Sequence, residues 1–134
     1  MDYSFTVNRR QDYLHVKVSG INSPDTVLRY MAEVREACVR DSCPRVLIEE
    51  NLQGPSLSTA AVYGVISRAS QSAAAVVMKI AFVDVNPNHD QGLMKFAETV
   101  AVNRGVEVCV FKNVTAAEQW LTSQTSVPDR SDKP

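Results

Sequence analysis

The stretch Leu47–Ser70, LIEENLQGPSLSTAAVYGVISRAS, joins a strand-like segment directly to a helix-like one. Its first residues belong to the segment Arg45–Glu50, RVLIEE, whose central apolar run is typical of a strand buried on both faces. Turn-forming residues follow, and from Ser58 apolar residues recur at helical spacing as far as Ala69. The stretch therefore predicts a strand, a loop and a helix in succession, which is the repeating unit of α/β proteins.

The segments on either side of this stretch predict more strands and helices of the same kind. Two short N-terminal segments alternate apolar and polar residues, as the strands of a hairpin do. The expected strands are Tyr3–Val7, Leu14–Val18, Arg45–Glu50, Met78–Asp84 and Val106–Phe111. The expected helices begin at Ser23, Ser58, Asn88 and Thr115.

Capping signals mark the expected helix starts. Ser23 is the predicted N-cap of the first helix, followed by a proline at its first position. The pairs Asn88 with Gln91 and Thr115 with Glu118 resemble capping boxes that open the third and fourth helices. In the second helix, Ala60 and Gly64 are small enough to let the helix lie close against a sheet, and we expect this close packing.

The element order defines the expected fold class. The order β-β-α-β-α-β-α-β-α indicates a single α/β domain with a mostly parallel five-stranded mixed sheet and about four helices. A chain of 134 residues is the size of one ordinary domain. We expect this domain to span residues 1–123. Residues 124–134, QTSVPDRSDKP, have little to bury, and we expect a disordered tail there.

Composition argues against several classes of function. With 14 basic and 15 acidic residues, the chain has no charge excess that would attract nucleic acid. The longest apolar run is interrupted by Lys79 and is too short to span a bilayer, and the N-terminus lacks the pattern of a signal peptide. We therefore expect a soluble, cytoplasmic protein. No dinucleotide-binding or P-loop motif is present, so we expect no cofactor.

The cysteines and histidines give no signal of a metal site. The three cysteines, Cys38, Cys43 and Cys109, form no CxxC pair and suit a reducing compartment. Cys38 continues the apolar stripe of its helix, so we expect it in the core. The chain has two histidines, of which His15 lies on the polar side of its strand and is expected to be solvated. We predict no metal site.

Two loops at the carboxyl ends of neighbouring parallel strands are the candidate functional region. The segments GPSLST and VDVNPNHD are expected to emerge side by side at one edge of the sheet, facing two helix N-termini. We predict that a partner or ligand surface there is lined by Ser56, Ser58, Thr59, Asn86 and His89. The alternative is that Ser56 or Ser58 only caps the second helix.

Two other functions are compatible with the same residues. Ser58, His89 and Asp84 could meet as nucleophile, base and orienting acid of a serine hydrolase, but the chain has no G-x-S-x-G elbow. Small residues on and after the second helix, including Ala61 and the run 73–75, could instead leave a groove for a small apolar or lipid-like ligand. Close packing of the helix on the sheet is the other interpretation of the same residues.

From Tyr3 to Leu121 the chain resembles the SpoIIAA-like branch of the STAS domains. The resemblance rests on the element order, the serine region around Ser58, the strand KIAFVD, and RGVEVCVF followed by AAEQWL. It implies a bacterial, non-enzymatic regulator that binds a protein partner, as anti-sigma factor antagonists do. It also implies phosphorylation at the start of the second helix, at Ser58 or Thr59, with Glu49 or Glu50 near the acidic residue that closes the third strand.

The serine region departs from the motif of that family at two places. Leu57 stands where the family has an aspartate, and two alanines follow Thr59 where the family has Gly-Leu. The resemblance does not indicate the partner or the oligomeric state.

Overall fold

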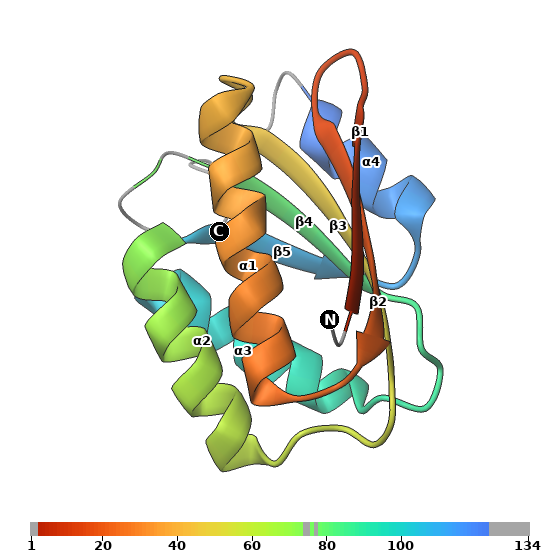
Figure 1. Ribbon diagram of the computed structural model, residues 1–134, viewed down its shortest axis with the longest axis vertical. Coiled ribbons are helices and arrows are strands. Elements are labelled where there is room, and N and C mark those ends of the chain that lie inside the picture. The colour runs from red at the N-terminus through yellow and green to blue at the C-terminus, as the bar shows by residue number, and fades with distance from the viewer. Residues whose placement is uncertain (1–2, 74–75, 77, 124–134) are drawn as a thin grey trace, which may run out of the picture.

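The protein is one mixed sheet flanked by helices on both faces (Figure 1). The computed structural model describes residues 3–73, 76 and 78–123. Its elements are β1 (Tyr3–Arg9), β2 (Leu14–Ile21), α1 (Pro24–Arg40), β3 (Arg45–Gln53), α2 (Thr59–Ala73), β4 (Lys79–Asp84), α3 (Gln91–Asn103), β5 (Glu107–Phe111) and α4 (Val114–Thr122). This order and the α/β class confirm the sequence prediction. The expected tail, residues 124–134, and residues 74 and 75 lie outside the described residues.

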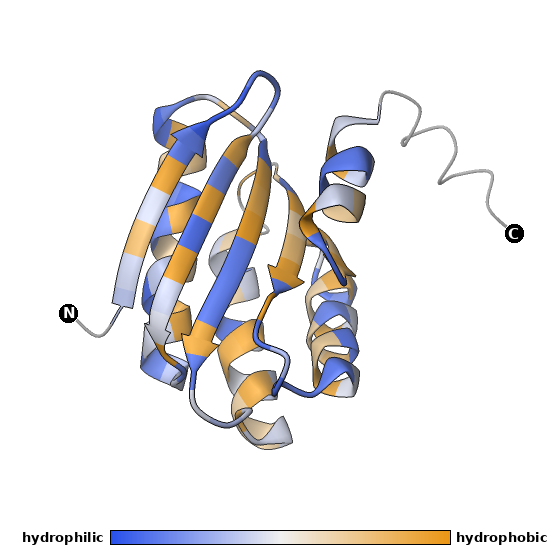
Figure 2. Ribbon diagram, turned by 90° about the vertical axis from the view of Figure 1, so that its right-hand side faces the viewer, coloured by the Kyte–Doolittle hydropathy of each residue, from blue (hydrophilic) through white to orange (hydrophobic). Residues whose placement is uncertain are grey.

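The strands are arranged in the order of the chain, β1-β2-β3-β4-β5. β1 pairs with β2 antiparallel, and every other pair is parallel, so the predicted hairpin and mixed sheet are confirmed. Because right-handed crossovers between successive neighbours return on the same side, α1, α2 and α3 share one face of the sheet. α4 follows the edge strand and packs on the other face (Figure 2).

Two apolar cores lie on the two faces of the sheet. The larger one joins alternate residues of β2, β3 and β4 to the three-helix layer, with Val46 and Ile48 fully buried. The smaller one joins Leu47 to Ala117 and Leu121 of α4. β3 is therefore buried on both faces over this stretch, as its apolar run predicted.

α1 begins and packs as the sequence predicted. The Ser23 side chain accepts a hydrogen bond from the Thr26 backbone N–H at 3.1 Å, and Pro24 is the first helical residue. Val34 and Cys38 lie on the buried side of the helix, so the expected position of Cys38 in the core is confirmed. None of the helices in the described part of the chain is long and apolar enough to cross a membrane.

Two of the predicted helix starts are wrong. α3 is capped by Asp90, not by Asn88, because the Asn88 backbone N–H is held in the preceding loop by the Asn86 side chain. α4 is capped by Asn113, not by Thr115, because the Asn113 side chain reaches the backbone N–H three residues later. In both helices the true cap and the predicted cap are polar residues two positions apart, and both are of a type that caps helices.

The predicted close packing of α2 on the sheet is also wrong. Ala60 is exposed, and a Cβ added to Gly64 would meet no other atom within 4 Å. α2 instead lies against α1 and α3, as part of a helix layer, and directs Val62 and Val65 inward. Because the small residues face outward, they do not bring the helix down onto the sheet, and space remains beneath it.

Candidate functional site

A cavity of about 250 Å³ lies between the helix layer and the sheet. Most of the side chains that line it are apolar and come from all three helices and from β4 and β5. They include Val27, Met31, Val65, Ile66, Phe82 and Ala97. An apolar cavity of about 150 Å³ holds a benzene molecule, so this one has room for about ten non-hydrogen atoms.

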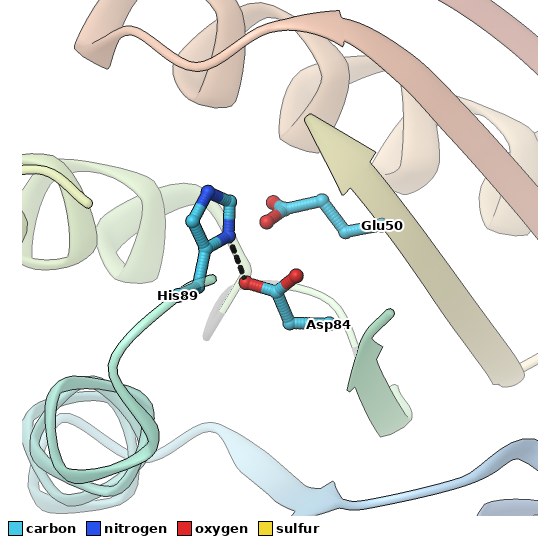
Figure 3. A group of neighbouring side chains, drawn as sticks. All are labelled: Glu50, Asp84 and His89. Carbon is cyan, nitrogen blue, oxygen red and sulfur yellow. Dashed lines mark hydrogen bonds and ion pairs between the residues drawn. The ribbon is translucent and has the colours of Figure 1, made fainter. Parts of the chain in front are cut away.

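Three buried titratable side chains converge at the cavity: Glu50 of β3, Asp84 at the end of β4, and His89 in the segment before α3 (Figure 3). Their relative exposures are 5%, 8% and 6%. One carboxylate oxygen of Glu50, one of Asp84 and one ring nitrogen of His89 all lie within 4.8 Å of one another. Because buried charged groups are costly unless paired, this arrangement requires specific hydrogen bonds.

Both ring nitrogens of His89 are hydrogen-bonded. Nδ1 lies 2.6 Å from Oδ2 of Asp84, and Nε2 lies 3.0 Å from the carbonyl oxygen of Gly54. A carbonyl oxygen only accepts, so Nε2 carries a proton in this arrangement. Burial lowers the pKa of His89, but the Asp84 carboxylate, the Gly54 carbonyl and Glu50 raise it, and the result is a pKa above the ordinary 6.5. The site therefore favours the positively charged ring.

Glu50 is the least compensated member of the group. Burial, which is the largest cause, and the nearby Asp84 charge raise its pKa from 4.5 to about 7, against the opposing effects of Tyr30 and His89. The Tyr30 hydroxyl donates a hydrogen bond to Oε2 of Glu50. Among the described residues no other side chain hydrogen-bonds to Glu50. Glu50 is therefore close to half ionised at neutral pH.

Asn86 fixes the loop that carries His89. Its Nδ2 donates to the carbonyl oxygen of Leu52 at 2.8 Å, which ties the loop to the end of β3. Its backbone N–H donates to Oδ1 of Asp84 at 3.0 Å. Asn86 is buried, so in this structure it positions the loop and does not present its side chain on a surface.

The serines and the threonine of the predicted edge divide between two environments. Ser56 lines the cavity, and its Oγ accepts a hydrogen bond from the Asp90 backbone N–H at 3.0 Å. Ser58 is exposed and caps α2, because its Oγ accepts from the Ala61 backbone N–H at 3.1 Å. Thr59 is the exposed first residue of α2. The two loops thus lie side by side, but their polar side chains do not form one surface.

The arrangement does not resemble a catalytic triad. Asp84 and His89 are paired, as a hydrolase would require. Ser58, however, is bonded to its own helix, and the nitrogen of His89 that would take a serine proton faces the Gly54 carbonyl oxygen. Among the described residues, no serine, threonine or cysteine side chain is hydrogen-bonded to the Asp84–His89 pair.

Glu50, Asp84 and His89 are also the group of described residues whose donor atoms lie close enough to hold a metal ion. A metal bound by His89 would have to replace either its bond to Asp84 or its bond to Gly54. Hydrogen bonding alone therefore accounts for the positions of the His89 ring and of the Asp84 carboxylate.

The prediction that His15 is solvated is wrong. His15 is 5% exposed, and its Nε2 lies 2.9 Å from Oε1 of Glu49. The Arg10 side chain approaches the other ring nitrogen at 3.5 Å. These two neighbours cover the ring on the face of the sheet opposite the cavity.

Comparison with known proteins gives similarity at the level of fold. No family model and no curated protein matches the sequence. Among solved structures, the chain is similar to an anti-sigma factor antagonist from Mycobacterium paratuberculosis, with a TM-score of 0.55 and 13% identity over 90% of this chain and 95% of that one. It is also similar to an uncharacterized protein with a SpoIIAA-like fold from Shewanella loihica PV-4, with a TM-score of 0.52 and 17% identity over 89% and 93%. The chain has the STAS/SpoIIAA-like fold.

Proposed function

We propose that this chain is a non-catalytic regulatory module that binds a small, mostly apolar ligand in the cavity beneath α2. The observation that carries the proposal is the cavity itself, which is about 250 Å³ and mainly apolar, with Glu50, Asp84 and His89 grouped at it. Ligand sites in proteins are commonly apolar hollows with a few convergent polar groups. The structure gives this function more support than the partner binding that the sequence favoured.

The apolar lining of this space supports the same conclusion. Apolar surface in contact with water costs about 25 cal/mol per Å² relative to buried surface. An apolar ligand that filled the space would remove part of this surface from water.

Binding of a simple apolar probe tests this function. Isothermal titration calorimetry with 1-octanol should show saturable binding to the wild-type protein. The variant Ala97→Leu, which places a larger side chain into the cavity, should bind the probe at least tenfold more weakly while remaining folded by circular dichroism. Equal binding by both proteins would place the ligand elsewhere and contradict the proposal.

A second proposed function is binding of a protein partner at the start of α2. Its support is the exposure of Ser58 and Thr59 at a helix N-terminus, together with the fold shared with an anti-sigma factor antagonist. A phosphate on either residue would be stabilised there by the helix dipole and free backbone N–H groups. A bacterial, cytoplasmic setting belongs to this proposal, and the free cysteines suit it.

Intact mass measurement tests the second function. Protein purified from its own host under phosphatase inhibition should carry one phosphate, mapped by peptide sequencing to Ser58 or Thr59. A chain that stays unmodified under all growth conditions would contradict phosphorylation control at this position.

A further inference from the structure

Among the three side chains at the polar end of the cavity, Glu50 accepts the fewest hydrogen bonds relative to its capacity. Asp84 accepts from the His89 ring on one oxygen and from the Asn86 backbone N–H on the other. Both nitrogens of His89 are also bonded. Glu50 accepts one side-chain hydrogen bond, from Tyr30, although a carboxylate can accept about four. A ligand that enters this end therefore meets a carboxyl group that lacks donors.

The charges at this end also favour a donor. The titratable groups that face Glu50 are Tyr30 from α1, Asp84 from β4 and His89 from the segment before α3. The His89 ring balances Asp84, because the two are directly paired. The Glu50 carboxylate then has no cation bonded to it among the described residues.

We propose that the ligand is a small apolar amine whose ammonium group donates hydrogen bonds to the Glu50 carboxylate while its apolar part fills the cavity. This inference rests on the proposed ligand-binding function and names the class of ligand. An ammonium group supplies both the positive charge and the donors that Glu50 lacks. A fatty acid would instead place a third carboxylate beside Glu50 and Asp84, which like-charge repulsion disfavours.

Two arginines also line the cavity and define the competing ligand class. Arg35 lies five residues after Tyr30 on α1, roughly 7 Å further along the helix, and its Nε is buried without a hydrogen-bond partner. Arg68 lines the cavity from the second half of α2 and is exposed. A carboxylate ligand would have to bind at these arginines. The test therefore includes a carboxylate probe and an Arg35 variant.

The protonation of Glu50 gives the amine a distinctive pH dependence. Burial raises the pKa of Glu50 to about 7, and an ammonium group binds the ionised form. The ionised fraction falls on the order of tenfold between pH 8 and pH 6. The affinity for an amine should fall by about the same factor, whereas the affinity for an uncharged alcohol should not fall.

Calorimetry with three probes that share one alkyl chain tests the proposal: octylamine, 1-octanol and octanoate, each at pH 8 and pH 6. Octylamine should bind the wild-type protein at pH 8 at least tenfold more tightly than the other two. Glu50→Gln, which keeps an acceptor for Tyr30, should remove this preference. Glu49→Gln is the matched control, because Glu49 contacts His15 on the opposite face of the sheet, and it should keep the preference.

The possible failures separate the two proposals. Octanoate that binds best, with loss of binding in Arg35→Gln, would overturn the amine assignment and leave the ligand-binding function standing. Equal affinities for octylamine and 1-octanol at both pH values would also overturn the amine assignment and leave the ligand-binding function standing. Failure of every probe to bind would overturn the ligand-binding function itself. If Glu50→Gln does not fold, the pH dependence of octylamine binding to the wild-type protein still decides the assignment.

Discussion

We expect the stability of the protein to fall as pH rises from 5 to 8, because of Glu50. The pKa of Glu50 is about 7 in the folded protein and 4.5 when unperturbed, so the folded state binds more protons between these values. Between these two pKa values each pH unit lowers the free energy of unfolding by about 1.4 kcal/mol, and the whole interval lowers it by roughly 3 kcal/mol. The pKa of His89 is also raised above its ordinary value of 6.5. Its stabilisation of the folded state is therefore complete below pH 6.5 and is lost as pH rises through the folded pKa, so His89 also lowers the stability as pH rises.

Urea unfolding between pH 5 and pH 8, followed by the fluorescence of Trp120, measures this dependence. Glu50→Gln should remove the part of the decrease that comes from Glu50 and leave the part that comes from His89. Glu49→Gln, on the opposite face of the sheet, should keep the wild-type slope. A wild-type stability that rises across this range, or equal slopes for the wild-type protein and Glu50→Gln, would refute the reasoning.

Three further substitutions test individual contacts. Ala97→Leu should stabilise the protein by about 1 kcal/mol in urea unfolding, because the added carbons occupy the cavity, and a loss of stability would argue against open space there. Ser58→Ala should cost about 1 kcal/mol, because the Ala61 backbone N–H loses its cap; an unchanged unfolding midpoint would show that the cap contributes nothing. Asn86→Ala should cost about 1–3 kcal/mol and lower the melting temperature, because the Leu52 carbonyl oxygen loses its donor; an unchanged melting temperature would contradict the role given to that bond.

The element order could be predicted from the sequence because periodicity reports which side of each segment is buried. Periodicity does not determine where a helix starts, because several residues near a start are suitable caps. Asn113 and Thr115 are both cap-forming residues two positions apart, and only the path of the chain decides between them. The same holds for Asn88 and Asp90, where the bond from the Asn88 N–H to Asn86 settles the choice.

The candidate site could be predicted only where topology determines it. Parallel strands place Gly54 and His89 at one edge of the sheet, and the structure joins them by a hydrogen bond. The pairing of Tyr30 with Glu50 depends on how α1 packs on β3, which local sequence does not specify. The cavity depends on the distance of α2 from the sheet, and Gly64 gave the wrong indication because it faces outward.

Native mass spectrometry of protein purified gently from its own host tests the central claim most directly, with the denatured mass of the same sample as reference. Bound ligand should appear as an added mass that is lost on denaturation and is absent from Ala97→Leu purified in the same way. A bare chain mass for the wild-type protein, or an added mass that Ala97→Leu retains, would contradict the claim that the cavity holds the ligand.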